Sequence, residues 1–160
     1  MENYNLFVIA RAIHVVSVVM WIGGVYFVTT VLIPKLRNEK DHIIRLAQFE
    51  ATESRFALQA KFITLIAGLS GFYMVNFLSG WQRYQYIEFW WLHLMSFVWL
   101  VFTVVLFVLE PFVLHRWFHR QAEINSDRAF ALLHNFHKVI LTVSLVAIFG
   151  AVTGSHGFRY

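Results

Sequence analysis

The stretch "RAIHVVSVVMWIGGVYF", residues 11–27, belongs to a long apolar run that contains a histidine. A helix rises about 1.5 Å per residue, so a run of roughly 20 apolar residues crosses the hydrocarbon of a bilayer. The run from Leu6 to Ile33 exceeds that length. It predicts a membrane-spanning helix that carries His14 near one end.

The rest of the chain repeats this pattern. Of its 160 residues, 59% are hydrophobic and 14% charged, and the mean hydropathy is +0.60, far from the balance of a water-soluble domain. Three more apolar runs are long enough to span: Phe56 to Ser79, Phe89 to Leu114 and Phe136 to Thr153. We therefore predict an all-α fold, an integral-membrane four-helix bundle forming one transmembrane domain over residues 1–160. Because Glu2 stands where a signal peptide would be basic, we expect the first helix to be retained.

The placement of the basic residues predicts how the bundle is oriented. Lysines and arginines gather in two connections, residues 34–55 and 115–135, which the positive-inside rule assigns to the cytoplasmic face. The connection from Gly80 to Glu88 has one cation, Arg83, and several aromatic residues typical of a membrane interface. Both termini are then expected on the outer (periplasmic) side of a bacterial inner membrane. The net charge of +4 reflects this orientation, and we expect no nucleic acid as partner.

Within this plan the connections and helix contacts have their own signals. Residues 38–56 show apolar positions at helical spacing and predict a short surface helix, whereas residues 115–135 are expected to form a solvated loop. Pro34 and Pro111 stand near the ends of spans, where a kink or stop costs least. Helices in lipid approach each other at small residues. We expect contacts at Ala60, Thr64, Ala67, Gly68, Gly71, Gly150 and Gly154.

Two histidines in different spans point to a haem. Cysteine is absent, which excludes disulfides, thiolate metal sites and covalently attached haem. His14 lies near the outer start of the first span and His93 near the outer start of the third, so both are expected at one depth. A b-type haem takes two axial ligands from different helices. We predict that His14 and His93 ligate the iron of one haem b.

Residues on the same helical faces would complete this site. Ser17, Trp21 and Gly24 follow His14 at offsets of three, seven and ten, and Ser96 follows His93 at three. A small residue beside an aromatic one can bound a flat ligand. Arg11 is placed either to pair with a haem propionate or to anchor the helix at the headgroups.

A second haem on the inner side is a further hypothesis. His115 and His137 lie near the inner ends of the third and fourth spans, and His137 shares a face with Leu141 and Ser144. The alternative is that the inner histidines are ordinary surface residues of a solvated loop.

Copper is the competing metal, since thioether and imidazole ligands suit Cu(I). Met20, Met74 and Met95 lie in the first three spans. Met20 and Met95 stand six and two residues from the nearest candidate histidine, which turns them away from the ligand faces.

One carboxylate, Glu110, falls inside an apolar run. We expect it to pair with Arg116 or Lys138 or to relay a proton, because ionisable groups at membrane depth are usually functional. No hydrolase triad, phosphate-binding loop or H-E-x-x-H motif occurs in the chain.

Three stretches carry a family resemblance: "AIHVVSVVMWIGGVYF", "ESRFALQAKFITLIAGLSGFYM" and "WWLHLMSF". The chain resembles the CopD/HemJ-like superfamily of small four-helix membrane proteins, which includes copper-resistance protein D domains and HemJ-type protoporphyrinogen oxidases. The resemblance implies a helical membrane bundle and haem-binding histidines at His14 and His93. The HemJ-type chains carry a lysine after the third-span histidine and a Pro-Arg pair late in span one, where this chain reads "HLMSF" and "YFVTTVLIP".

Together these features predict a membrane b-type cytochrome that transfers electrons, with a quinone or porphyrinogen as redox partner and a protoporphyrinogen oxidase-like activity as the enzymatic variant. A redox partner protein or a homo-oligomer is expected beside the lipid bilayer. Two alternatives stay open: a copper transport or resistance protein using His and Met ligands, and a cofactor-free structural subunit of a respiratory complex.

Overall fold

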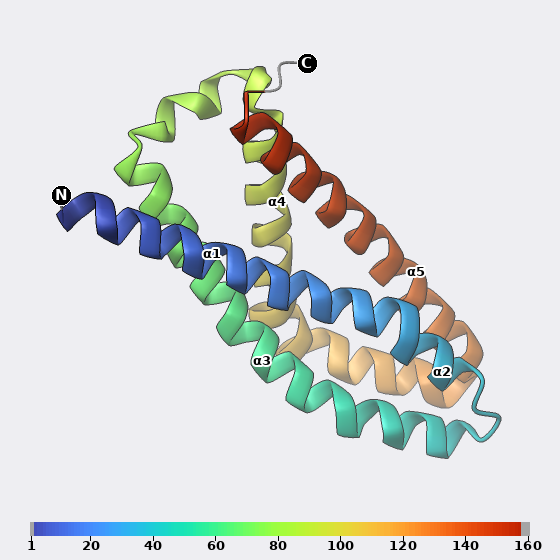
Figure 1. Cartoon of the computed structure of the whole chain (residues 1–160). Coiled ribbons are helices and arrows are strands. Elements are labelled where there is room, and N and C mark those ends of the chain that lie inside the picture. The colour runs from blue at the N-terminus through green and yellow to red at the C-terminus, as the bar shows by residue number, and fades with distance from the viewer. Residues whose placement is uncertain (1, 158–160) are drawn as a thin grey trace.

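A computed structural model of the chain describes residues 2–157, without the side chains of residues 2, 54, 113–115 and 123. Between residues 2 and 157 the chain is helical and forms no strand (Figure 1). Its elements are α1 (Glu2–Phe27), the π-helical η1 (Val28–Leu32), α2 (Ile33–Arg37), α3 (His42–Phe77), the 3-10 helices η2 (Gly80–Gln85) and η3 (Ile87–Phe89), α4 (Trp90–Val104), the π-helical η4 (Val105–Leu114) and α5 (His115–Ser155).

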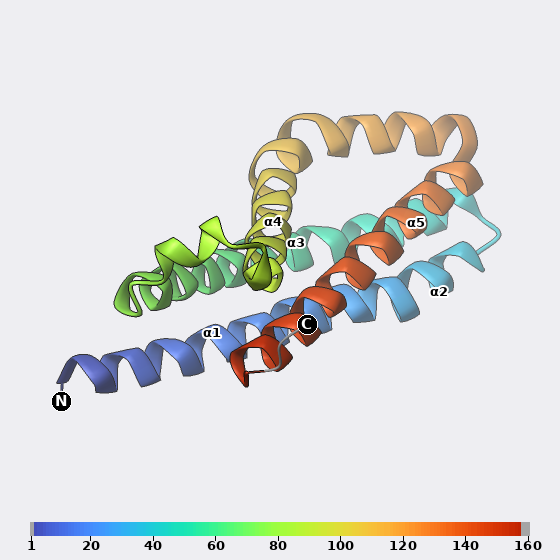
Figure 2. The ribbon, with the colours of Figure 1, turned by 90° about the horizontal axis from the view of Figure 1, so that it is seen from above.

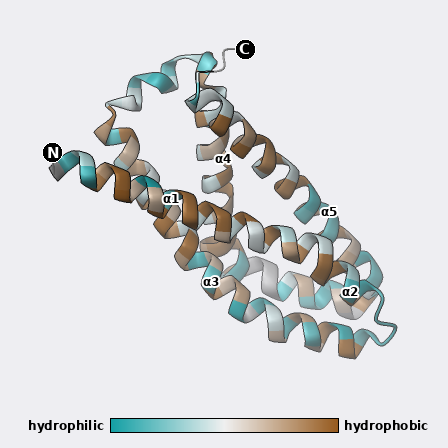
Figure 3. Ribbon diagram, in the orientation of Figure 1, coloured by the Kyte–Doolittle hydropathy of each residue, from teal (hydrophilic) through white to brown (hydrophobic). Residues whose placement is uncertain are grey.

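Four helical stretches are long and apolar enough to cross a membrane: Asn3–Arg37, His42–Phe77, Ile87–Phe112 and Ile124–Ser155. Apolar residues remain exposed on them, since Leu69, Phe72 and Phe149 are each more than 60% exposed. Figure 3 shows the hydrophobic character of these helices in brown. Helices satisfy all their backbone hydrogen bonds internally, which hydrocarbon requires. The predicted all-α class is confirmed, and so is the presence of four helical stretches long and apolar enough to cross a membrane, although their bounds differ from those predicted.

The spans associate as two antiparallel pairs. α1 lies along α3, and α4 lies beside α5 (Figure 1). The pairs meet in a central core, where the Trp21 indole of α1 stands edge-on to the Phe102 ring of α4, with ring centroids 4.7 Å apart. The buried members of this central core are Trp21, Ile22, Val25, Ala67, Val98, Phe102, Ile140, Leu141 and Ala147.

Both termini and the connection between α3 and α4 lie at one end of the bundle, here called the terminal end (Figure 1). The opposite end, here called the basic end, holds the connection between α2 and α3 and the bend of α5. A second core packs there, formed by Leu36, Phe49, Phe118, Ala122, Ala129 and Phe130. Arg45, 5% exposed, closes this end because its guanidinium donates to Asp127 at 2.6 Å and to Ser126 at 3.1 Å.

Two expectations about the connections are wrong. Residues 42–56 form no separate surface helix, because they are the first half of the continuous 36-residue α3, whose start the Asp41 carboxylate caps by accepting from the Ile43 N–H at 2.8 Å. Residues 115–135 form no solvated loop. They belong to α5, which bends sharply at Asn125, where the backbone leaves the helical region (Figure 2).

The bend of the third span has a local cause. Pro111 cannot donate a backbone hydrogen bond, and it lies inside the π-helical η4. The chain turns between α4 and the part of α5 that precedes Asn125, here called the first arm of α5, and then continues as a helix (Figure 2). The part of α5 after Asn125 is its second arm. The candidate span ends at Phe112, next to Pro111, but the helix changes direction and continues into α5, as Figure 2 shows in the yellow-to-orange part of the ribbon.

The predicted small-residue contacts are confirmed, with a refinement. Ala60, Thr64 and Ala67 are buried on α3. The glycines receive aromatic rings of neighbouring helices. A Cβ on Gly68 would lie 2.4 Å from Nε1 of Trp99, and one on Gly150 would lie 2.4 Å from the Trp90 ring. The small residues thus form notches for side chains.

This packing predicts that Gly68→Ala destabilises the protein by about 1–3 kcal/mol, because the added methyl group overlaps a buried indole. Gly23→Ala is the matched control, since a Cβ on Gly23 meets nothing within 4 Å. Its expected effect is neutral or slightly stabilising, owing to better helix propensity. Thermal unfolding in detergent, followed by circular dichroism, compares the two, and equal midpoints would contradict the notch.

Candidate functional site

His14 of α1 is held by the neighbouring helix. Its Nδ1 lies 2.8 Å from the Ala67 carbonyl oxygen and 3.2 Å from the Ser70 hydroxyl, both on α3. A carbonyl oxygen only accepts, so the hydrogen-bond network assigns the proton to Nδ1. Nε2 then carries a lone pair. Metal-ligating histidines commonly show this arrangement, in which one ring nitrogen donates to a carbonyl and the other is left for the metal.

A glycine makes room for this imidazole. A Cβ on Gly71 of α3 would lie 3.1 Å from Cε1 of His14, so a larger residue would press on the ring. The sequence pattern identified Ala67 and Gly71 as helix contacts but did not link them to His14. Their spacing on one face of α3 was the available signal, and only the antiparallel packing of α1 on α3 shows which residue they face.

His93 of α4 has a different environment, in which both ring nitrogens lie at backbone carbonyls. Nδ1 is 3.0 Å from the Phe89 oxygen and Nε2 is 2.9 Å from the Tyr84 oxygen. A neutral imidazole can donate to only one of them. The Tyr84 hydroxyl also lies 2.6 Å from the Ser96 hydroxyl, so His93 and Ser96 share one helical face, as predicted.

The two predicted haem ligands therefore contact different neighbours. The His14 ring faces α3, whereas the His93 ring faces Tyr84 of η2, in the connection between α3 and α4. In its present position His93 would have to give up the Tyr84 carbonyl before Nε2 could bind a metal.

Two of the residues expected to flank the haem take part in packing between the helices. Trp21 is buried in the central core, and its Nε1 has no hydrogen-bond partner among the described residues. The notch at Gly24 is filled by the Phe56 ring, 2.7 Å from the position of a Cβ. Arg11 is exposed on α1.

At the basic end His137 lies on the face of α5 that also carries the buried Leu141 and Ser144, as predicted. Its Nδ1 is 2.9 Å from the Leu133 carbonyl oxygen, one turn earlier. The side chain of His115, the other predicted inner ligand, lies outside the described residues.

His134 corrects the expectation that the inner histidines are surface residues. It is 8% exposed, with Nε2 3.0 Å from the Thr29 carbonyl oxygen and Nδ1 3.2 Å from a guanidinium nitrogen of Arg37. Arginine only donates, so Nδ1 accepts and Nε2–H donates to Thr29. Thr29 lies in η1, where the π-helical turn disturbs the regular backbone pairing. Both ring nitrogens are used, so His134 of α5 holds η1 and α2 against α5.

Two ion pairs connect α3 with η4 and with the part of α5 that precedes Asn125. Glu110 pairs with Lys61 of α3, with Nζ 2.7 Å from Oε2, and not with Arg116 or Lys138 as expected. The wide separation in sequence between Lys61 and Glu110 hid this partner. Nearer the basic end, Glu50 lies 3.0 Å from Nε2 of His119.

Metal sites built from three or more His, Asp or Glu side chains are absent from the described part of the chain. Met20 is exposed on α1, and Met95 packs against the central core. A haem needs only two protein ligands, so the absence of such a cluster does not bear on it.

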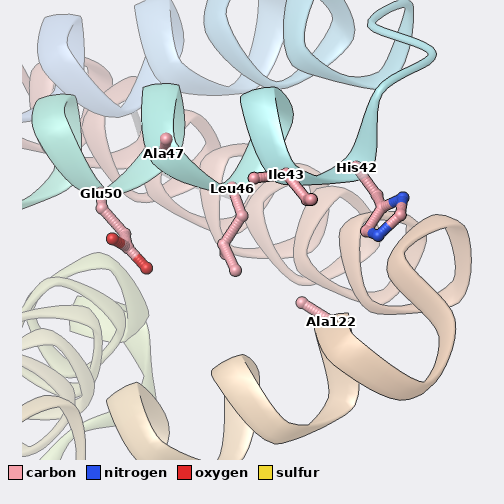
Figure 4. A pocket seen from close by; sticks show the side chains of 6 residues that line it. All are labelled: His42, Ile43, Leu46, Ala47, Glu50 and Ala122. Atoms are coloured by element: carbon pink, nitrogen blue, oxygen red, sulfur yellow. The ribbon is translucent and has the colours of Figure 1, made fainter.

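Two adjoining cavities lie at the basic end, between the start of α3 and the first arm of α5 (Figure 4). Their volumes are about 370 and 320 Å³, and both are lined by His42 and Ala122. None of the predicted ligands lines either cavity. Figure 4 shows Glu50 and His42 at opposite ends of the larger of the two, with Leu46 and Ile43 of α3 between them and Ala122 of α5 across from them.

The His134 network predicts a stability effect. His134→Ala should lower the free energy of unfolding by about 1–3 kcal/mol, because the Thr29 carbonyl and the Arg37 guanidinium lose a buried partner. His156→Ala, at an exposed position near the end of α5, should stay within about 0.5 kcal/mol. Equal thermal midpoints of the two variants in detergent would show that the network contributes nothing.

Comparisons of the chain with models of protein families, with curated proteins and with solved structures gave no match. The resemblance to the CopD/HemJ-like superfamily therefore stays a prediction from short motifs. What the chain does is inferred from the geometry around its histidines.

Proposed function

We propose that this chain is an integral-membrane b-type haem protein that transfers electrons, with His14 as an axial ligand. The observation that carries the proposal is the hydrogen bond of 2.8 Å from Nδ1 of His14 to the Ala67 carbonyl oxygen, which leaves the lone pair of Nε2 for a metal. The motifs shared with the CopD/HemJ-like superfamily support the same residue.

His14 ranks above the other histidines for a physical reason. A bond from Nδ1 to the carbonyl one turn earlier is common for helical histidines, and the exposed His156 makes one to Val152 at 2.7 Å. The similar contacts of His93 and His137 therefore carry little weight. The acceptor of His14 lies on another helix, so the ring is oriented by the packing of α1 against α3.

The proposed haem would be bound on the side of His14 where Nε2 carries its lone pair. Haem iron exchanges one electron at a time, at a potential set by its axial ligands and burial. His14 would supply an axial nitrogen, and the Ala67 carbonyl would keep that ring oriented. His93 is proposed as the second ligand, after its Nε2 leaves the Tyr84 carbonyl. A second haem near His137 extends the proposal to the basic end.

We infer the location, orientation and partners of the protein from its charge distribution and composition. We place the basic end in the cytoplasm and both termini outside, by the positive-inside rule, in a bacterial inner membrane. A quinone or a porphyrinogen dissolved in the lipid would exchange electrons with the haem, and a redox protein or another copy of the chain would be the protein partner. Porphyrinogen oxidation is a second reaction of this kind, supported by the family resemblance alone.

The proposal predicts that the protein purified in detergent shows the visible absorption bands of a b-type haem, which sharpen on reduction. His14→Ala should lose most of the haem, because the oriented ligand is gone, while His156→Ala should keep it. Reduced-minus-oxidised spectra with a haem assay measure both. Haem retained in His14→Ala, or a colourless wild type, would contradict the proposal.

The same preparation distinguishes the alternatives. Copper bound in stoichiometric amount without haem would favour a copper transport or resistance protein, and a metal-free, colourless protein would favour a structural subunit.

His93 can be tested separately. We expect His93→Ala to keep the haem but to convert the iron from a six-coordinate low-spin to a five-coordinate high-spin state, because one axial nitrogen is lost. Electron paramagnetic resonance of the oxidised protein reports the spin state. An unchanged low-spin signal would show that His93 stays bound to the Tyr84 carbonyl and that another group ligates the iron.

A further inference from the structure

The ion pair between Lys61 and Glu110 lies in the apolar part of the bundle. Lys61 is near the midpoint of α3, and Glu110 lies in η4, inside the candidate span Ile87–Phe112. The two side chains are 27% and 22% exposed. Charges at membrane depth are costly and usually functional, and a buried ion pair is seldom more stable than two apolar side chains. We therefore expect the Lys61–Glu110 pair to have a role other than stabilising the fold.

Polar groups continue along the same face of α3 on both sides of Lys61. Toward the basic end this face carries Glu53 and Glu50, of which Glu50 contacts His119 at 3.0 Å. Toward the centre, three residues after Lys61, it carries Thr64. Three residues correspond to roughly 4.5 Å along a helix, a step that one water molecule can bridge.

Thr64 differs from the other hydroxyls of the spans. Most of these donate to the carbonyl four residues earlier, as do Ser17, Thr29, Ser70, Thr103 and Ser144. The Thr64 hydroxyl is fully buried and has no hydrogen-bond partner among the described residues, and the same holds for Nε1 of Trp21. Trp99, which packs against the central core containing Trp21, donates to the Thr64 carbonyl at 3.0 Å. The centre of the bundle thus holds two buried polar groups without a hydrogen-bond partner among the described residues.

Of the elements that pack against η4, α3 and α5 carry titratable side chains. α3 provides Lys61 together with Glu50 and Glu53, and the first arm of α5 provides His119. The second arm of α5 provides His137 and Lys138, and α4 carries no titratable side chain between His93 and its end at Val104. Lys61 is the cation in direct contact with Glu110, with Nζ 2.7 Å from Oε2.

We propose that Glu110 is a proton-binding site reached from the basic end by way of Glu50 and His119, with Thr64 as the next group toward the bundle centre. An O–H bond forms on the Glu110 carboxylate as an O–H bond of hydronium at the basic end breaks. One proton enters and no electron moves. Lys61 is the cation bonded to the carboxylate that takes up the proton. The inference does not depend on a haem.

The experiment uses the full chain in lipid vesicles sorted so that all molecules have one orientation. Infrared difference spectra are recorded after the pH is lowered on one side only. We expect the C=O band of a carboxylic acid when the basic end is acidified, shifted in D₂O and lost in Glu110→Gln. Glu110→Asp keeps the carboxylate and should keep the band. Acidifying the terminal end should leave this band absent.

Matched variants separate the roles. Glu88→Gln removes an exposed carboxylate of η3 and should leave the Glu110 band unchanged. Lys61→Met should increase the protonated fraction at neutral pH several-fold, while Lys138→Met, at an exposed lysine of α5, should not. His119→Phe should slow the appearance of the band after a pH jump several-fold. Circular dichroism confirms that each variant is folded.

Three results would overturn the proposal: a band that survives in Glu110→Gln, a band that appears equally from either side, or identical behaviour of Lys61→Met and Lys138→Met. None of these measurements involves visible haem absorption, so a failure here leaves the proposed function of His14 standing, and a protein without haem leaves the proton site testable.

Discussion

Polar side chains inside hydrocarbon must find partners within the bundle, and this constraint organises the structure. His14 bonds to a carbonyl of the neighbouring helix, and Lys61 and Glu110 bond to each other across two spans. Most hydroxyls donate to a backbone carbonyl of their own helix. The side chains that depend on other helices are therefore the ones that fix how the spans pack, and they are also the candidates for function.

Aromatic rings seated on glycines set the contacts between the spans. Trp99 fits against Gly68, Trp90 against Gly150, and the His14 ring against Gly71. A driving force from water is absent between helices in lipid, so close van der Waals packing has to stabilise the bundle. The orientation of His14 follows from the same packing, because the notch at Gly71 and the Ala67 carbonyl lie one turn apart on α3.

The two ends of the bundle differ in chemistry. The terminal end carries His14, His93 and the aromatic connection around Tyr84. At the basic end a second hydrophobic core, a buried arginine and the His134 network hold the bent third span and α5 in place. α3 contacts the key polar side chain of each half, His14 of α1 nearer the terminal end and Glu110 of η4 nearer the basic end.

The amino-acid sequence was enough to predict the all-α class, the four apolar spans, the small residues at helix contacts and the position of His14 near one end of the first apolar run. These follow from composition and helical periodicity, which are local properties. The packing of the helices was needed to show that Lys61 is the partner of Glu110, that His134 of α5 is buried against η1 and α2, and that the Tyr84 carbonyl lies at Nε2 of His93. Such contacts join residues far apart in the chain. They depend on the register and rotation of whole helices against each other, and periodicity within one helix holds no information about either.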